Sequence, residues 1–212
     1  MSELKTLAEA VIKGDINTAL AETQKALDSG AGPQDILDNG LIAAMDDVGD
    51  RFSKGLIFVP QMLRSAKTMQ ECVKLLTPLF QGSGVTSKGK VIIGTVKGDL
   101  HDIGKNLVSM MMEGAGFQIT DMGIDVSPEN FVKKVEEEKP DILAMSALLS
   151  TTMPAMYQTI EALEKAGLRD KVKVMIGGAP VTENYAQEIS ADGYAPDAGS
   201  SVTKAKKLLG VS

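Results

Sequence analysis

In the first 76 residues, apolar side chains recur with the period of an α-helix. The first helical face is formed by Leu4, Leu7, Ala8 and Val11. A second helix is predicted between Asp15, a residue type that caps helices, and Gly30, which stops them. A third helix opens near Pro33 and is broken at Gly55, and a fourth starts near Pro60. Four helices joined by short turns predict a small bundle.

A polar stretch follows the predicted bundle. Residues 81–90, QGSGVTSKGK, are rich in glycine, serine and lysine and contain little that a core could bury. Such a composition is typical of a linker between domains. We therefore expect a helical cap domain at residues 1–80 and a second domain at residues 91–212.

From residue 91 onward, short apolar runs alternate with helical patterns. Strands are predicted at residues 91–96, 117–123, 141–147 and 171–178, with a short final strand or turn at 193–197. Helices are predicted at 103–113, 127–139, 151–167, 182–190 and 200–210, with Ser127 and either Thr151 or Thr152 as caps. Five such units in about 120 residues predict an α/β fold with a doubly wound, parallel, five-stranded sheet of the flavodoxin-like, Rossmann-type class.

Composition and charge restrict the classes of partner and site. The net charge is -6 with both signs interspersed, which argues against nucleic acid as a partner. Cys72 is the one cysteine, so no disulfide can form within the chain, and we expect this thiol to pack inside the bundle. The first residues carry charges where a signal peptide would be apolar, and no apolar run is long enough to cross a bilayer. We expect a cytoplasmic protein without a membrane partner.

The chain has one histidine, His101, placed between two aspartates in the segment KGDLHDIGKN. This segment follows the first predicted strand, and ligands of parallel α/β folds bind beyond the carboxyl ends of the strands. Asp99 can hydrogen-bond one ring nitrogen and so make the other a better ligand or base. A solvent-exposed histidine beside a helix capped by Asp102 accounts for the same pattern, so this segment by itself leaves both interpretations open.

Several classes of site lack the residues that they need. A zinc site requires three or four nitrogen, sulfur or oxygen ligands, whereas this chain has one histidine and one distant cysteine. A phospho-acceptor receiver domain needs an aspartate at the end of the third strand, where Ser146 stands. Neither Gly-x-Ser-x-Gly nor Gly-x-Gly-x-x-Gly occurs. One histidine serving a metal fits best if a tetrapyrrole-like ring supplies the other ligands.

Three sequence elements, in this order, resemble the signature of cobalamin-binding domains. Its Asp-x-His-x-x-Gly, Ser-x-Leu and Gly-Gly elements are matched by Asp99, His101 and Gly104, by Ser146 and Leu148, and by Gly177 and Gly178. The helical half is similar to the cap that precedes this domain in methionine synthase. The whole chain resembles the stand-alone corrinoid proteins of methylamine, methanol, glycine betaine and aryl methyl ether methyltransfer systems.

The resemblance implies that the chain binds a cobalamin or related corrinoid, with His101 as the lower axial ligand of cobalt and Asp99 hydrogen-bonded to its other nitrogen. The cofactor's own lower base would leave cobalt, and its nucleotide tail would run into the domain. Gly104 would make space for the tail. Ser146 would hydrogen-bond the displaced base, and Leu148 would line the slot that holds this base. Gly177 and Gly178 would let the fourth strand lie against the tail, although a plain turn explains this pair taken alone. The remaining residues expected at the cofactor are Asp102, Ile103 and Thr152.

In the cap, the resemblance places apolar side chains above the cobalt. Phe58 and Met62 are expected to touch the upper face of the cofactor, and a role in the bundle core is the alternative for both. A site that is covered at rest must open to two different partners. We therefore expect the bundle to swing away on the linker at residues 81–90.

The resemblance implies a corrinoid methyl carrier that is not catalytic alone. A substrate-specific methyltransferase would transfer a methyl group to Co(I), giving methylcobalamin, and a second methyltransferase would pass it to tetrahydrofolate or to a thiol. Oxidised Co(II) would need a reductive activator as a further partner. A cobalamin-sensing regulatory module and an adenosylcobalamin mutase subunit are the alternatives; the first is disfavoured because no basic recognition helix is found, and the second because no catalytic barrel is present. The methyl donor is left open.

Overall fold

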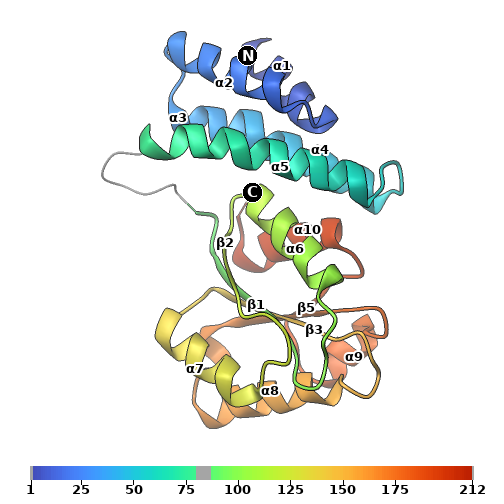
Figure 1. Ribbon diagram of the computed structural model, residues 1–212. Coiled ribbons are helices and arrows are strands. Elements are labelled where there is room, and N and C mark those ends of the chain that lie inside the picture. Colours follow the sequence, from blue (N-terminus) through green and yellow to red (C-terminus); the bar gives the residue numbers. More distant parts are fainter. Residues whose placement is uncertain (1, 80–86, 212) are drawn as a thin grey trace. The chain divides into compact units, whose positions relative to one another are not determined.

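The computed structural model describes residues 2–79 and 87–211 (Figure 1). The chain divides into two compact units. One, which we call the helical unit, comprises Met1–Ser87 with Glu113–Gly116, and the other, the sheet unit, comprises Lys88–Met112 with Phe117–Ser212. The boundary between residues 87 and 88 falls inside the predicted linker, of which residues 81–86 lie outside the described part of the chain.

The helical unit contains the helices that the apolar spacing predicts. They are α1 (Ser2–Lys13), α2 (Ile16–Asp28), a continuous helical run made of α3 (Pro33–Asp35), a π-helical segment (Ile36–Ile42) and α4 (Ala43–Ser53), and α5 (Val59–Leu76), followed by a short 3-10 turn (Thr77–Leu79). Asp15 caps α2 as predicted, because its carboxylate accepts a hydrogen bond from the N–H of Thr18 at 3.1 Å. The sequence pattern did not predict the π-helical segment.

The apolar faces of these helices form the core of the helical unit. The fully buried large side chains there are Leu7, Ile36, Leu41, Met45, Met62 and Leu76. Gly40, in the π-helical segment, lies against α1, where an added Cβ atom would come within 2.9 Å of the Leu7 side chain. Cys72 is buried on the inner face of α5, and burial raises the pKa of its thiol, as expected for a structural cysteine.

The sheet unit contains the predicted five-stranded parallel sheet. Its strands are β1 (Lys90–Thr95), β2 (Gln118–Asp121), β3 (Ile142–Ser146), β4 (Lys173–Gly177) and β5 (Gly193–Tyr194). They lie in the order β2-β1-β3-β4-β5, and every pairing is parallel. This order reverses direction between β1 and β3, which creates a crevice at the carboxyl ends of these two strands.

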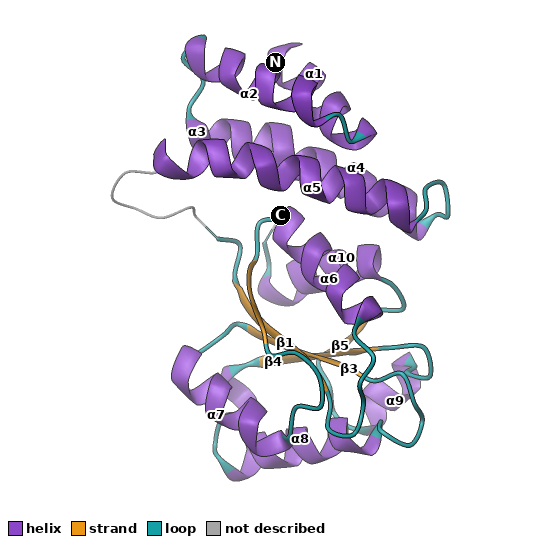
Figure 2. Cartoon of the chain, in the orientation of Figure 1, coloured by secondary structure: helices purple, strands orange, loops and turns teal. Residues whose placement is uncertain are grey.

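Five helices of the described chain cover the two faces of this sheet (Figures 1 and 2). They are α6 (Ile103–Gly114), α7 (Pro128–Glu138), α8 (Pro154–Lys165), α9 (Glu183–Glu188) and α10 (Ala198–Leu209), with a 3-10 turn at Arg169–Lys171. Helices α6 and α10 lie on one face, and α7, α8 and α9 lie on the other. Phe131 of α7 packs against β1, where a Cβ atom at Gly94 would meet its ring at 2.8 Å. The doubly wound architecture is therefore confirmed.

One of the two helix caps predicted in this unit is wrong. Ser127 caps α7 as predicted, by accepting from the N–H of Asn130 at 3.3 Å. Helix α8, however, begins after Met153 without any side-chain cap, so neither Thr151 nor Thr152 has that role. The Thr152 hydroxyl is directed to a buried carboxylate instead. No helix in the described ranges is both long and apolar enough to span a bilayer.

Candidate functional site

The carboxyl ends of the central strands place three predicted sequence elements side by side. In the sheet register, Ser146 of β3 lies between Thr95 of β1 and Gly177 of β4. The loop from β1 to α6 carries Asp99 and His101, and the loop from β3 to α8 carries Leu148 and Thr152. Elements that lie far apart in sequence therefore meet at one edge of the sheet, as parallel strands require.

His101 is held by Asp99 through two hydrogen bonds. The ring Nδ1 lies 2.7 Å from Asp99 Oδ1, and the main-chain N–H of His101 donates to the same oxygen at 3.1 Å. An ionised carboxylate accepts hydrogen bonds only, so Nδ1 carries the proton and Nε2 of the neutral ring carries a free lone pair. The His101 side chain is 51% exposed, whereas that of Asp99 is fully buried. This pair therefore presents a fixed, basic nitrogen at the surface of the unit.

The second oxygen of Asp99 ties the two loops together. Oδ2 accepts from the Thr152 hydroxyl at 2.7 Å, from the N–H of Leu148 at 2.7 Å and from the N–H of Leu149 at 3.3 Å. Burial by itself would raise the pKa of Asp99, but the hydrogen bonds from Thr152, His101 and Leu148 outweigh it and hold this pKa well below its usual range. Asp99 is therefore a buried anion whose charge is satisfied entirely by donors from these two loops.

The main chain of His101 is anchored to β1 as well. Its carbonyl oxygen accepts from the hydroxyl of Thr95, the last residue of β1, at 2.9 Å. Thr95 is itself buried. The imidazole is thus fixed through both its ring and its backbone, which is the preorganisation that a metal ligand needs.

Exposed apolar residues are found in or directly after the two loops that Asp99 joins. Leu100 precedes His101 in the β1–α6 loop, and Ile103 is the first residue of α6. Leu148 and Leu149 lie in the β3–α8 loop, and their N–H groups bind Asp99. All four are exposed large hydrophobic residues. Exposed apolar residues that gather around a polar anchor are typical of a ligand-binding surface. A broad, largely apolar ligand with one electrophilic centre suits this arrangement.

The predicted glycines differ in what surrounds them. An added Cβ atom at Gly104 would have no neighbour within 4 Å, so the first turn of α6 is open there. At Gly178 the φ angle is +128°, and a Cβ atom would come within 1.9 Å of the Ala147 carbonyl oxygen. At Gly177 it would come within 3.2 Å of the Ala195 carbonyl oxygen. Glycine is therefore required at position 178 by the packing of the chain on itself, whether or not a ligand also approaches.

Ser146 and Asp102 are available at the same edge of the sheet. Ser146 is partly exposed at the end of β3, and its main-chain oxygen accepts from the N–H of Val96 at 3.0 Å. The exposed carboxylate of Asp102 accepts from the Asn106 side chain at 3.1 Å, which links the residue before α6 to the first turn of that helix. Both residues can therefore offer polar groups to a ligand at the β1 and β3 ends.

In the helical unit, the two residues predicted to contact the cofactor have different environments. Phe58 is 69% exposed, just before α5, whereas Met62 is fully buried. Met62 shares a face of α5 with Ser65, whose hydroxyl donates to the Ile12 carbonyl oxygen at the end of α1. Membership of the bundle core, the alternative left open for both residues, accounts for Met62. The cofactor contact of Phe58 stays a prediction.

Sequence reasoning missed two polar residues next to the site. Lys105 of α6 is almost completely buried and pairs with Asp121 at the end of β2 and with the side chain of Asn106. Asp125, in the loop after β2, binds the β1–α6 loop. The local signal that could have pointed to Lys105 is a charged residue in the first turn of α6, a helix whose later residues are mostly apolar. No group of three or more histidine, cysteine or acidic side chains that could hold a metal ion is found in the described ranges.

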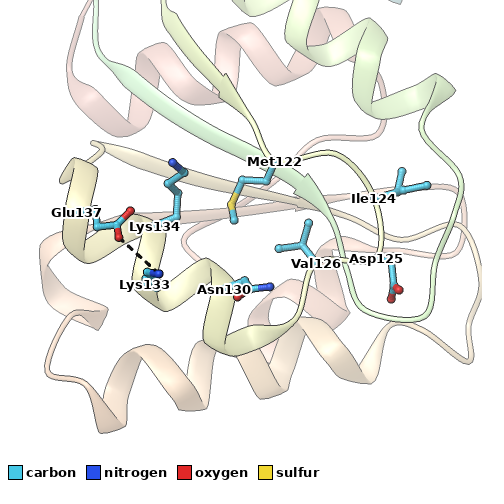
Figure 3. Close-up of a pocket in the computed structure, with 8 residues that line it drawn as sticks. All are labelled: Met122, Ile124, Asp125, Val126, Asn130, Lys133, Lys134 and Glu137. Carbon is cyan, nitrogen blue, oxygen red and sulfur yellow. Dashed lines mark ion pairs between the residues drawn. The ribbon is translucent and has the colours of Figure 1, made fainter.

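A separate groove lies beside α7 (Figure 3). It encloses about 310 Å³ and is lined by Met122, Ile124, Asp125, Val126, Asn130, Lys133, Lys134 and Glu137. None of the residues predicted to bind the cofactor lines it. Its connection to the site is Asp125, which stands at one end of the groove.

Comparison with protein families assigns both halves of the chain to one ligand class. A family model described as "B12 binding domain" matches residues 89–202, and a second model with the same description matches residues 3–77. The first match contains all the predicted site residues of the sheet unit, and the second contains Phe58 and Met62.

Individual relatives match over nearly the full length. The chain is 44% identical to dimethylamine corrinoid protein 1 of Methanosarcina acetivorans, over 97% of each chain, and 42% identical to the trimethylamine corrinoid protein of Methanosarcina barkeri, over 96% and 94%. A cobalamin-binding protein from Desulfitobacterium hafniense superposes with a TM-score of 0.84 at 32% identity, over 97% of this chain and 98% of that one. The methanol:cobalamin methyltransferase complex MtaBC from Methanosarcina barkeri contains a chain that superposes with a TM-score of 0.87 at 28% identity, over 100% and 81%.

Proposed function

This chain belongs to the family of B12-binding corrinoid proteins, and we propose that it carries a methyl group on a corrinoid between two methyltransferases. The observation that carries the proposal is the chain of hydrogen bonds from Thr152 through Asp99 to His101 at the carboxyl edge of the sheet. It leaves one nitrogen of the only histidine free at the surface. Full-length similarity to corrinoid proteins of methylamine systems supports the same role.

The donor set fits cobalt held in a macrocycle. Imidazole nitrogen is a good ligand for late first-row metals, and its partner Asp99 fixes the tautomer and raises the basicity of Nε2. One nitrogen alone cannot complete a coordination sphere, and the described residues offer no other metal-ligating cluster. A corrin ring would supply the further ligands that the protein lacks. His101 therefore suits the lower axial position.

The bound corrinoid would supply a cobalt centre that accepts a methyl group from one partner and gives it to another. The protein's residues would hold and tune this centre. His101 would bind from below, Asp99 would adjust how strongly the imidazole donates, and Thr152 would keep Asp99 ionised and oriented. Ser146 and Leu148 would contact the displaced nucleotide base, and Asp102 and Ile103 would contact the ring or its side chains.

Glycines would make room for the nucleotide tail, and the helical unit would shield cobalt. Gly104 offers open space at the start of α6. Gly177 and Gly178 would let the end of β4 lie against the tail. Phe58 is an exposed aromatic residue that can cover the upper face of the ring. Such shielding keeps water and oxidants from the reactive metal.

The partners of this chain would be methyltransferases. The structural relative from the methanol system is part of a complex with its methyltransferase, and two full-length sequence relatives are named for dimethylamine and trimethylamine. Methylated amines are therefore the first donors to test. A second methyltransferase with a folate or thiol acceptor, and a reductive activator for oxidised cobalt, would complete a cytoplasmic system.

Reconstitution tests the cofactor and its ligation together. The purified chain, incubated with cobalamin and desalted, should retain one equivalent and become coloured. In the Co(II) form, electron paramagnetic resonance should show splitting by one protein nitrogen, and His101→Ala should abolish this splitting while the protein stays folded, because the ring is half exposed. Asp99→Asn should keep the corrinoid but shift the Co(II)/Co(I) potential.

Two results would contradict the proposal. A folded wild-type chain that stays colourless with several cobamides would refute the assignment of a corrinoid cofactor. A coloured chain whose Co(II) spectrum is the same in wild type and His101→Ala would refute His101 as the cobalt ligand but would support the assignment of the cofactor. Methyl transfer from a methylamine methyltransferase to the loaded chain then tests the carrier role itself.

A further inference from the structure

The loop that follows β2 is hydrogen-bonded to the loop that carries His101. Asp125 donates its main-chain N–H to the carbonyl oxygen of Asp99 at 3.1 Å. Its carboxylate Oδ1 accepts from the N–H of Gly98 at 2.7 Å. One residue therefore binds two consecutive residues of the neighbouring loop, on either side of the Gly98–Asp99 peptide.

We propose that Asp125 is a positioning residue for the cobalt ligand: it fixes the backbone at Gly98 and Asp99, and through Asp99 it fixes the imidazole of His101. The proposal rests on the proposed function, because it assigns Asp125 a part in presenting the axial ligand. Asp125 belongs to none of the signature elements found in the sequence. It is recognised from its contacts in the folded chain.

The backbone conformations at both residues favour this two-point grip. Asp125 has a φ angle of +53°, in the left-handed region, and Gly98 has a φ angle of +82°. Aspartate and asparagine are the non-glycine residues that enter this region most readily, because their short polar side chains bond locally. The position therefore needs a residue that tolerates left-handed backbone and also carries an acceptor at Oδ1. Aspartate satisfies both requirements.

Backbone pairing next to Asp125 keeps its two hydrogen bonds to the His101 loop in register. Val96 and Val126 form a parallel β-bridge, and the N–H of Val126 donates to the carbonyl oxygen of Thr95 at 2.9 Å. Thr95 in turn donates its hydroxyl to the His101 carbonyl oxygen. The loop after β2 thus continues the pairing of β1 and β2 beyond the strand ends and meets the His101 loop at Asp125.

The side chain of Asp99 depends on this placement. Its two oxygens must reach His101 on one side and Thr152 with Leu148 on the other, all within hydrogen-bond distance. A carboxylate that serves two loops can do so only from one backbone position. Asp125 holds the peptide that sets this position, whereas no hydrogen bond between Asp125 and His101 is found in the described residues.

Asp125 is exposed, at the end of the groove in Figure 3, so a substitution there leaves no core cavity. Two variants separate the need for left-handed backbone from the need for a side-chain acceptor. Asp125→Asn keeps the left-handed preference and an oxygen acceptor. Asp125→Gly keeps the left-handed backbone and the main-chain N–H but removes the acceptor for Gly98. The first variant is the matched control for the second.

The chain without cofactor gives the first measurement. It has one histidine, so ring nitrogen resonances from ¹⁵N-histidine-labelled protein, purified with a tag free of histidine, report His101 alone. Wild type and Asp125→Asn should show the tautomer protonated at Nδ1, with a slowly exchanging Gly98 amide. Asp125→Gly should speed exchange of that amide by about 10-fold or more, as expected when a bond to a charged acceptor is lost, and should mix the tautomers.

The loaded chain gives the second measurement. The nitrogen splitting of the Co(II) spectrum should be complete in wild type and Asp125→Asn and partial in Asp125→Gly. The proposal fails if Asp125→Gly, shown folded by circular dichroism, keeps a single tautomer and full nitrogen splitting. It fails without any variant if the Gly98 amide of wild type exchanges freely. Failure of the chain to bind corrinoid would refute the proposed function but leave the tautomer measurement to judge Asp125.

Discussion

Thr152→Val should destabilise the sheet unit by removing a donor from a buried charge. The Thr152 hydroxyl lies 2.7 Å from Asp99 Oδ2 and 2.8 Å from the Leu149 carbonyl oxygen. It has one hydrogen, and the ionised carboxylate is the stronger acceptor. Valine has nearly the same shape as threonine but carries a methyl group in place of the hydroxyl, so the substitution deletes this bond and leaves the side-chain volume nearly unchanged.

The magnitude follows from burial. Asp99 is fully buried and Thr152 nearly so, so water cannot replace the lost donor. Hydrogen bonds to charged groups contribute about 1.5–3 kcal/mol, and a charged acceptor left short of a donor in a buried site costs at least as much. The N–H groups of Leu148 and Leu149 remain in place. We therefore expect a loss of about 2 kcal/mol at neutral pH.

The loss should depend on pH in a defined direction. The folded-state pKa of Asp99 lies below its unfolded-state value, so its ionisation stabilises the fold above the unfolded pKa, and this contribution disappears as pH falls through the folded pKa. Thr152→Val raises the folded-state pKa toward the ordinary value. The difference between variant and wild type should be largest near pH 7 and should narrow below about pH 4.

Tyrosine fluorescence offers a clean assay. The chain has no tryptophan, and its three tyrosines, Tyr157, Tyr185 and Tyr194, all lie in the sheet unit. Urea unfolding followed at this signal therefore reports that unit. A loss of about 2 kcal/mol should lower the urea midpoint by roughly 1–2 M.

Thr152→Ser is the matched control, because it keeps the hydroxyl and removes a methyl group. It should lose less than about 1 kcal/mol. The reasoning is refuted if Thr152→Val unfolds within about 0.5 kcal/mol of wild type at pH 7, or if valine and serine cost the same. A valine penalty that is unchanged at acidic pH would separate the stability effect from the charge of Asp99.

Four further substitutions test other parts of the structure. Gly178→Ala should lower the free energy of unfolding by more than about 3 kcal/mol or prevent folding, because its Cβ atom would lie 1.9 Å from the Ala147 carbonyl oxygen. Gly104→Ala has open space around it, so it should leave the urea midpoint unchanged. It should instead weaken corrinoid retention, measured by absorbance. Met62→Ala should lower the stability of the helical unit by about 2–5 kcal/mol, measured by circular dichroism at 222 nm, because a fully buried side chain leaves a cavity. Phe58→Ala should change that stability by less than about 0.5 kcal/mol, because the ring is 69% exposed, and should instead speed oxidation of reduced cobalt in the loaded chain. Equal destabilisation by the Met62 and Phe58 substitutions would contradict the different roles assigned to these residues.

The sequence by itself determined the local structure and the identity of the ligand. Helical spacing identified the four-helix half, and alternating apolar runs identified the parallel sheet. Asp15 and Ser127 were recognised as caps because a cap acts within three residues of itself. Asp99 and His101 are also neighbours in sequence, so their hydrogen bond could be anticipated from the motif.

The tertiary structure decided which distant residues serve this pair. Thr152 is of a residue type that often caps helices, yet its hydroxyl binds Asp99, 53 residues away. Asp125 meets Gly98 across 27 residues, and Gly178 meets Ala147 across the β3–β4 pairing. Periodicity states which face of an element is apolar, but it carries no information about which loop lies against which. Those contacts depend on strand order and register, which are set when the whole sheet packs. The donors of Thr152, Leu148 and Leu149 to Asp99 are therefore found only in the folded chain.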